Sequence, residues 1–369
     1  MKVFLLYPYF FTADGSQKKI GGVETYIESL VEVILNLGLT PVVCQFSNVS
    51  FKKKYLNYTI HGYKVNSIKS LYKKIENDVN KTKDLILFVS DLWSIKLTDV
   101  RTLSIQHGIY WDIPRSKGPF ILYYIQRIKQ VLTALINFNK TKYSVCVDYN
   151  FYNWYKTFNV RARCKRHWVI PNFADHIISL SELNNKFKSQ TSTINIIFAR
   201  RFYEFRGVVI FTEAMKRIME EYPNVNLTFA GEGPYENYIK ENFENYGGRF
   251  HMIKYSPKES FEVHKVFDIA VVPTTGSEGT SLSLLEAMGA GCVPVCTPVG
   301  GLSNIIIDEY NGYISMPNAE DLYLTIKKAI LNIKDIKIAE NAVETVRVSF
   351  SKIKWLRAWT DVLKYVINR

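Results

Sequence analysis

The sequence predicts an α/β fold with two domains, each built on a parallel sheet. The chain has 369 residues, which exceeds one domain of about 100–200 residues and suits two. Short apolar runs, typical of buried strands, alternate with longer segments of helical periodicity along the whole chain. The polar segment 179–193, rich in Ser, Asn and Lys, interrupts this alternation and is interpreted as a linker.

The first domain is expected to span residues 1–178. Its first strand follows directly from the N-terminal Met, because Pro8 stops the apolar run and no small-residue cleavage site of a signal peptide follows. Apolar runs predict strands at residues 2–7, 40–46, 84–89, 102–106, 143–147 and 167–170. Helical periodicity predicts helices at residues 24–37 and 119–138.

The second domain, expected at residues 194–350, repeats the rhythm. Strands are predicted at residues 194–198, 225–229, 250–253, 269–272 and 293–296. Helices are predicted at residues 208–221, 235–243, 280–289 and 321–333. The last segment, 351–369, has apolar residues at helical spacing, and we expect this helix to cross back to the first domain.

Composition excludes several classes of protein. With 47% hydrophobic and 22% charged residues, the chain is neither disordered nor fibrous. The longest purely apolar run, residues 120–125, is far shorter than the roughly 20 residues that span a bilayer, so an integral membrane protein is not expected. The five cysteines form no Cys-x-x-Cys pair, which favours reduced thiols in a cytoplasmic protein.

The formal net charge of +13 lies entirely in the first half. Residues 1–180 hold 25 Lys and Arg against 12 Asp and Glu, whereas residues 181–369 hold 22 of each kind. The runs Lys52–Lys54 and 161–166 contribute to the excess. This asymmetry indicates that the first half faces a polyanion or an anionic membrane, or else that it is a solvated basic surface.

The most informative segment is the Gly/Ser/Thr loop 274–281 between a predicted strand and a predicted helix. Such a junction points unpaired backbone N–H groups and the positive end of the helix dipole at one spot, which favours phosphate. Glu278 lies in the loop and Glu286 lies two turns into the helix, roughly 12 Å further on. With a diphosphate at the helix start, Glu278 reaches a sugar and Glu286 reaches ribose hydroxyls; the alternative is two surface glutamates.

Three weaker motifs follow other predicted strands. Arg201 and Arg206, five residues apart, suit a diphosphate clamp, although a surface pair of arginines is common. Gly21 and Gly22 let a backbone approach a ligand closely, or make an ordinary turn. His107 stands at the carboxyl end of a strand, where α/β folds place ligands, but a lone histidine is often structural.

Together these motifs resemble the retaining glycosyltransferases of family 4, which have the GT-B fold, two Rossmann-like domains facing across a cleft. The matching segments are Gly21-Gly22-Val23-Glu24, Ile170-Pro171-Asn172, Arg201 with Arg206-Gly207, Gly231-Glu232-Gly233-Pro234, Glu278-x7-Glu286, Gly291-Cys292-Val293-Pro294 and Gly300-Gly301. The chain departs from the pattern in three places. Ala199-Arg200 replaces the usual Gly before the first Arg, Arg206 stands where a Lys is frequent, and Gly279-Thr280-Ser281 replaces a Gly-Phe-Gly run.

The resemblance implies roles for these residues. Arg201 and Arg206 would neutralise the donor diphosphate, Glu278 would contact the donor sugar, and Glu286 would contact the ribose. The first domain would complete the site with a catalytic His107 and the glycine loop Gly21–Gly22. The backbone that would hold the distal phosphate belongs to Gly279, Thr280, Ser281 and Leu282. The chain contains no Asp-x-Asp, so we expect neither a metal nor another cofactor.

We therefore expect a cytoplasmic glycosyltransferase that moves a sugar from a nucleotide-sugar donor to a glycan or lipid-linked acceptor, in bacterial surface polysaccharide synthesis such as O-antigen, lipopolysaccharide or capsule. Its basic half is expected to dock on the inner membrane face as a peripheral protein, with no nucleic-acid partner. Two alternatives remain open. One is a nucleotide-sugar epimerase of the same fold, and the other is a non-enzymatic protein that binds a polyanion through its basic surface.

Overall fold

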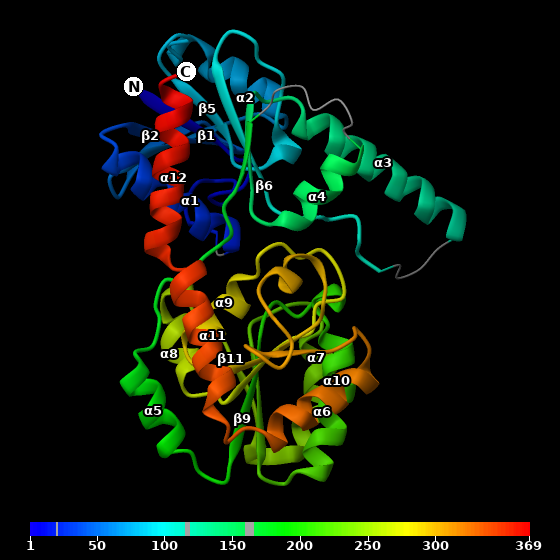
Figure 1. Cartoon of the computed structure of the whole chain (residues 1–369). Coiled ribbons are helices and arrows are strands. Elements are labelled where there is room, and N and C mark those ends of the chain that lie inside the picture. The colour runs from blue at the N-terminus through cyan, green and yellow to red at the C-terminus, as the bar shows by residue number, and fades with distance from the viewer. Residues whose placement is uncertain (20, 115–118, 159–165) are drawn as a thin grey trace. The chain divides into compact units, whose positions relative to one another are not determined.

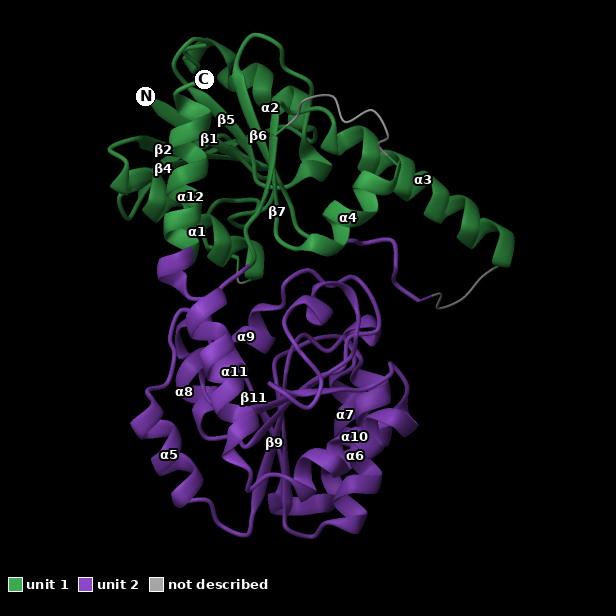
Figure 2. Cartoon of the chain, in the orientation of Figure 1, with its two compact units in different colours: residues 1–107, 117–171, 355–369 green, residues 108–116, 172–354 purple. Residues whose placement is uncertain are grey.

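A computed structural model of the chain describes residues 1–19, 21–114, 119–158 and 166–369. The chain divides into two compact units, coloured separately in Figure 2. Unit 1 comprises residues 1–107, 117–171 and 355–369, and unit 2 comprises residues 108–116 and 172–354. Each unit is a sheet covered by helices (Figure 1).

In the described part of unit 1 the sheet has eight strands in the order β3-β4-β2-β1-β5-β6-β7-β8. The strands are β1 (Lys2–Leu6), β2 (Thr40–Phe46), β3 (Phe51–Tyr55), β4 (Tyr58–Tyr63), β5 (Leu85–Phe88), β6 (Arg101–Gln106), β7 (Tyr143–Cys146) and β8 (Arg166–Val169). All neighbouring pairs are parallel except β3 with β4. Strands β1 and β5 are buried on both faces, which explains their continuous apolar sequences.

The helices of unit 1 pack on this sheet or extend from it. They are α1 (Gly22–Asn36), α2 (Ile68–Ile75), α3 (Phe120–Phe138), α4 (Tyr149–Phe158) and α12 (Lys352–Ile367), whose first residues belong to unit 2. Short 3₁₀ turns lie at η1 (Glu76–Asp78) and η2 (Asp91–Trp93). Helix α12 is held by Trp359, which is fully buried and donates from Nε1 to the Tyr26 hydroxyl of α1 at 2.9 Å.

Unit 2 contains a six-stranded parallel sheet in the order β11-β10-β9-β12-β13-β14 among its described residues. The strands are β9 (Ile194–Ala199), β10 (Val225–Ala230), β11 (Phe250–Ile253), β12 (Ile269–Val272), β13 (Val293–Cys296) and β14 (Tyr313–Ile314). The α-helices are α5 (Leu180–Lys188), α6 (Val208–Glu221), α7 (Glu236–Phe243), α8 (Ser260–Lys265), α9 (Leu282–Gly289), α10 (Ala319–Leu331) and α11 (Ile336–Ser349). The 3₁₀ turns are η3 (Glu204–Arg206), η4 (Glu244–Arg249), η5 (Pro257–Glu259) and η6 (Gly300–Asn304).

Two regions differ from the prediction. The segment 179–193, predicted as a linker, contains helix α5, which starts with a capping box between Ser179 and Glu182. Its periodicity is weak because only Leu183 is fully buried, in the core of unit 2. The chain instead passes between the units at 107/108, 116/117, 171/172 and 354/355.

The second difference concerns β3 and β4, which the sequence did not predict. The lysine run Lys52–Lys54, interpreted as basic surface, forms most of edge strand β3, in which exposed and half-buried side chains alternate. Lysines on an edge strand discourage pairing with another chain, so the charge and the strand are compatible. The second basic run, 161–166, lies outside the described residues except for Arg166.

Among the described residues, none of the helices combines the length and the apolar character needed to cross a membrane.

Candidate active site

The parallel sheet of unit 2 brings the main predicted motifs to one edge. Strands β9 and β12 are neighbours and parallel, so their carboxyl ends meet at the same edge of the sheet. Arg200 follows β9 directly. Pro273 and the Gly/Ser/Thr loop 274–281 follow β12. These two segments, more than 70 residues apart in sequence, are therefore adjacent in the fold.

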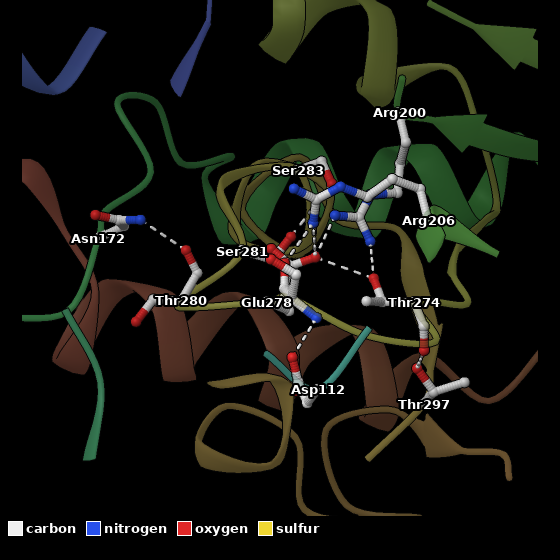
Figure 3. Close-up of polar contacts among 11 residues, drawn as sticks. Asp112, Asn172, Arg200, Arg206, Thr274, Glu278, Thr280, Ser281, Ser283 and Thr297 are labelled. Carbon is white, nitrogen blue, oxygen red and sulfur yellow. Dashed lines mark hydrogen bonds and ion pairs between the residues drawn. The ribbon is translucent and has the colours of Figure 1, made fainter. Parts of the chain in front are cut away.

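Glu278 lies at the centre of a cluster of polar contacts (Figure 3). Its Oε2 atom accepts hydrogen bonds from Arg200 Nη2, from Arg206 Nη1 at 2.6 Å and from the Thr274 hydroxyl at 3.0 Å. Arg200 also donates to the Thr274 hydroxyl oxygen. The side chains of Arg200 and Glu278 are 6% and 9% exposed, whereas that of Arg206 is 25% exposed. Arg206 is thus the cation of this cluster that a ligand reaches most easily.

Electrostatics keep Glu278 charged in this buried place. Burial by itself raises the pKa of the carboxyl, but the charges of Arg200 and Arg206 outweigh it and hold the pKa below its ordinary value. Burial lowers the pKa of Arg200, and the charge of Glu278 opposes that shift. The cluster is therefore a carboxylate with two guanidinium groups and carries an excess positive charge.

The position of Arg206 depends on the glycine that follows it. Arg206 ends the short turn η3, and Gly207 has φ +84°, a left-handed conformation that other residues rarely adopt. A Cβ atom at Gly207 would lie 1.8 Å from the Pro273 carbonyl oxygen, at the end of β12. Gly207 thus lets the chain turn tightly against the loop that carries Glu278 while opening helix α6.

The loop around Glu278 is held by neighbouring backbone. Ser277 has φ +57°, and its N–H donates to Asp112 Oδ1 at 2.8 Å. On the other side, the N–H of Gly301 donates to the Glu278 carbonyl at 3.2 Å. A Cβ at Gly300 would lie 2.0 Å from that same carbonyl oxygen, so the Gly300–Gly301 pair lets η6 pack directly on the loop.

The loop leads into the N-terminus of helix α9. Ser281 is the N-cap residue, but its side chain makes no capping hydrogen bond to the helix backbone. Thr280 and Ser281 are almost completely buried, and the Thr280 carbonyl accepts from Asn172 Nδ2 at 2.7 Å. The predicted phosphate-binding positions Gly279, Thr280, Ser281 and Leu282 therefore form the entry to α9, where uncapped N–H groups favour an anion.

Glu286 lies inside α9, as predicted. Its Oε2 atom accepts from the Ser260 hydroxyl at 2.7 Å, and Ser260 begins helix α8. Burial raises the pKa of Glu286 above its ordinary value, with Ser260 acting in the opposite direction. As a residue Glu286 is half-buried, and its carboxylate is in contact with Ser260.

In unit 1, His107 follows β6 and lies close to the end of β5. Its Nε2 atom is 2.7 Å from the Val89 carbonyl oxygen, and its ring packs edge-on against Tyr26 at 5.3 Å between centroids. Because a carbonyl only accepts, Nε2 carries the hydrogen and Nδ1 has the free lone pair. Burial lowers the pKa of His107 to about 4, so the imidazole is neutral at pH 7.

The predicted glycine pair opens helix α1 in the same unit. Gly21 is the N-cap residue, in an extended conformation with no side chain to cap the helix, and Gly22 is the first helical residue. Both follow β1, which is separated from β6 only by β5. The glycine pair and His107 therefore lie toward the same edge of the unit 1 sheet.

The two arginines that follow β9 differ in burial. Arg201, predicted to bind the donor diphosphate, is exposed, whereas its neighbour Arg200 is buried and donates to Glu278. The sequence pointed to Arg201 because of its five-residue spacing from Arg206. Arg200 lies two residues beyond the predicted strand 194–198, because β9 extends one residue further, to Ala199.

The segment that carries the cluster around Glu278 is similar to known proteins. Residues 181–345 match the family model of glycosyl transferases group 1. This match covers α5 to the greater part of α11, and so includes Arg200, Arg206, Glu278 and Glu286.

Curated relatives extend the similarity. Over 173 residues the chain is 25% identical to the lipopolysaccharide 1,2-N-acetylglucosaminetransferase of Salmonella typhimurium, covering 43% of this chain and 44% of the relative. Over 180 residues it is 25% identical to the alpha-monoglucosyldiacylglycerol synthase of Streptococcus pneumoniae, covering 47% and 40%. The matched region thus spans less than half the length of these relatives.

Solved structures show the same fold over the whole chain. Sucrose-phosphate synthase from Thermosynechococcus elongatus superposes with a TM-score of 0.78 at 14% identity, covering 100% of this chain and 99% of that one. Anabaena HepE in complex with UDP superposes with a TM-score of 0.72 at 15% identity, covering 99% and 100%. The protein has the GT-B fold, with two parallel-sheet α/β domains in one chain, as the sequence predicted.

Proposed function

We propose that this protein is a retaining glycosyltransferase of the family 4 type, which transfers a sugar from a nucleoside-diphosphate donor to a glycan or lipid-linked acceptor. The observation that carries the proposal is the cluster of Arg200, Arg206 and Glu278 beside the uncapped N-terminus of α9. The match of this region to glycosyl transferases group 1 supports it.

The cations of the cluster act on the leaving group. Breaking the bond between the anomeric carbon and the diphosphate oxygen leaves positive charge on the sugar and negative charge on the diphosphate. Fixed charges and N–H dipoles that meet this developing negative charge stabilise the transition state without reorganising. Arg206, the more exposed guanidinium, supplies one such charge, and the first N–H groups of α9 supply the dipoles.

Arg200 is proposed to have a different role in the reaction from that of Arg206. It is nearly enclosed, with its guanidinium bound to Thr274 and Glu278, so it positions the carboxylate and adds to the local positive field. When a diphosphate binds to Arg206, it competes with Glu278 for that guanidinium. The Glu278 carboxylate then gains capacity to accept hydrogen bonds from hydroxyls of the donor sugar.

Glu286 is assigned to the ribose of the donor. It lies eight residues after Glu278, in the second turn of α9, the helix whose N-terminus is the proposed diphosphate position. Ser260 fixes one carboxylate oxygen, which leaves the remaining lone pairs for the ribose hydroxyls. The predicted roles of His107 and of the glycines at the start of α1 stay part of the proposal, and His107 has a neutral Nδ1 acceptor.

The names of similar proteins support the choice of substrates. The names of the Salmonella typhimurium and Streptococcus pneumoniae relatives indicate glycan and lipid acceptors. HepE has been solved with UDP and with UDP-glucose. We therefore propose a role in bacterial surface polysaccharide assembly, such as O-antigen or capsule, and UDP-sugars as the first donors to test.

We further propose that the reaction takes place in the cytoplasm and needs no divalent metal. The four described cysteines, Cys44, Cys146, Cys292 and Cys296, are free and buried, as expected in a reducing compartment; Cys164 lies outside the described residues. The arginine pair supplies positive charge at the proposed diphosphate position, the place where some enzymes use a metal ion. Assays with a chelator test this part directly, since activity that disappears with EDTA and returns with Mg²⁺ would contradict it.

The test is a donor panel with product analysis. Purified protein is incubated with UDP-, GDP-, ADP- and dTDP-sugars, with and without a lipid-linked or soluble glycan acceptor, and the released nucleoside diphosphate is measured. We expect one donor to turn over, faster with acceptor, and NMR to show the donor's anomeric configuration kept in the product. Conversion of the donor sugar without release of nucleotide would instead indicate an epimerase, and no reaction with any donor would contradict the proposal.

A further inference from the structure

Helix α3 carries a row of large apolar side chains that remain exposed. The row consists of Ile121, Ile125, Ile128, Leu132 and Ile136, which we call the α3 stripe. Their exposed fractions lie between 53% and 70%, although isoleucine and leucine are usually buried in a folded chain. The first turns of α3 add further exposed apolar side chains, Phe120, Leu122 and Tyr124.

The α3 stripe is one continuous face of the helix. Its members are spaced four, three, four and four residues apart, so at 3.6 residues per turn they fall within an arc of about 80°. Gln126 and Gln130 lie outside this arc, and Lys129 borders it. The helix is therefore amphipathic, but its apolar face is the exposed one, which is the reverse of a helix that packs on a core.

The helix is attached to unit 1 mainly by its last turns. Phe138 is fully buried against the rings of Phe151 and Tyr155 of α4, at 5.0 and 4.6 Å between centroids. The Asn137 carbonyl accepts from the Ser94 hydroxyl at 2.8 Å. Figure 1 shows the rest of α3 extending away from the unit 1 sheet. The last turn of α3 is therefore fixed to unit 1, while the apolar face of the preceding turns is exposed.

The charged residues of α3 and of the sequence on either side of it, from Ile113 to Val147, are all basic. From Ile113 to Val147 the sequence contains no Asp or Glu and six Lys and Arg. Lys129 on α3 and Lys142 after it are exposed, and α4 adds exposed Lys156 without an acidic residue. Two copies of such a surface repel each other, whereas a surface that is both apolar and negatively charged attracts it.

We propose that the α3 stripe docks this protein on an anionic lipid bilayer, with α3 lying in the interface. The five aliphatic side chains enter the boundary between headgroups and acyl chains, and the neighbouring lysines meet anionic headgroups. The sequence indicated membrane binding by the basic first half of the chain, and this proposal assigns that binding to helix α3. The stripe shares no residue with the donor site, so the proposal does not depend on the proposed reaction.

The experiment is vesicle flotation of the full-length protein. The vesicles are phosphatidylcholine alone and phosphatidylcholine mixed with phosphatidylglycerol, at low and high salt. The test variant combines Ile125→Glu, Ile128→Glu and Leu132→Glu. The control variant combines Val266→Glu, Ile307→Glu and Leu331→Glu in unit 2, residues that are 63% to 68% exposed against 53% to 58% for the three test residues. Circular dichroism and thermal unfolding confirm that both variants fold.

We expect the wild type and the control variant to float with anionic vesicles, less so at high salt, and only weakly with neutral ones. The α3 variant should lose this binding by about tenfold or more, because three charges enter the apolar face. Three results would overturn the proposal: equal flotation with neutral and anionic vesicles, equal loss in both variants, or no flotation at all. A wild-type dimer in sedimentation that the α3 variant abolishes would assign the stripe to a second copy instead.

Discussion

The Arg206 guanidinium and the Glu278 carboxylate form a hydrogen-bonded ion pair, from Nη1 to Oε2 at 2.6 Å. The same oxygen also accepts from Arg200, which is more deeply buried. One carboxylate oxygen therefore neutralises part of two positive charges at the entry to α9. A diphosphate and Glu278 compete for the same cations, and the predictions for this site follow from that competition.

Neutralising Glu278 separates binding from transfer. In Glu278→Gln the side chain keeps its shape and can still hydrogen-bond, but it no longer offsets the arginine charge. We expect calorimetry to show nucleoside-diphosphate affinity equal to or tighter than that of the wild type. Transfer should fall by about 100-fold or more, because the donor sugar loses a charged acceptor. Weaker diphosphate binding together with normal turnover would contradict the competition.

The two consecutive arginines should differ in their effect on stability. Arg200→Met removes one partner of a buried ion pair and leaves Glu278 with only Arg206, so we expect the free energy of unfolding to drop by about 3 kcal/mol. Arg201→Met changes an exposed residue and should cost less than about 1 kcal/mol. Urea denaturation of both variants measures the difference. Equal losses would show that the structure assigns the wrong arginine to the cluster.

The contact of Gly301 with the loop can be tested by adding one methyl group. In Gly301→Ala the new Cβ would lie 2.5 Å from the Gly279 carbonyl oxygen and 2.8 Å from the Thr280 nitrogen, so this backbone must shift. We expect a loss of about 1–3 kcal/mol in stability and about tenfold weaker nucleoside-diphosphate binding. The control is Gly248→Ala, where a Cβ meets nothing within 4 Å. Similar behaviour of the two variants would contradict the assigned packing.

Buried His264 makes stability depend on pH. Burial lowers the pKa of His264 from 6.5 to about 4 in the folded protein. The unfolded chain therefore binds a proton at higher pH than the folded one, and stability is lost as pH falls from about 6.5 to 4. The loss from this residue is about 3 kcal/mol. Replacing it in His264→Gln should flatten the curve of unfolding free energy against pH in that window; an unchanged slope would contradict the shift.

The fold was largely predictable from the sequence. Most strands of both units are short runs rich in apolar residues, so β2, β11, β12 and β13 were predicted with their observed ends. Strand β3 was missed because its lysines, suited to a sheet edge, hide the alternation. Helix α5 was missed because its polar composition is typical of a linker, and the capping box of Ser179 and Glu182 was not taken as a helix start.

The candidate site was predictable in its parts but not in its contacts. The loop around Glu278 and helix α9 could be recognised because a strand, a Gly/Ser/Thr loop and a helix follow one another in the sequence. The choice between Arg200 and Arg201 could not be made, since adjacent residues point in different directions and the end of β9 decides which one turns inward. The exposure of α3 was equally hidden, because periodicity shows an apolar face but not whether anything covers it.

The central claim is that Arg206, beside Glu278 and the entry to α9, binds the diphosphate of a nucleotide donor. The most direct measurement is isothermal titration of UDP, GDP, ADP and dTDP into the wild type and into Arg206→Ala, with Arg201→Ala as the matched control. The account predicts that one nucleoside diphosphate binds the wild type and Arg201→Ala alike, and binds Arg206→Ala about 100-fold more weakly. Equal affinity in all three proteins, or no binding to the wild type, would contradict it.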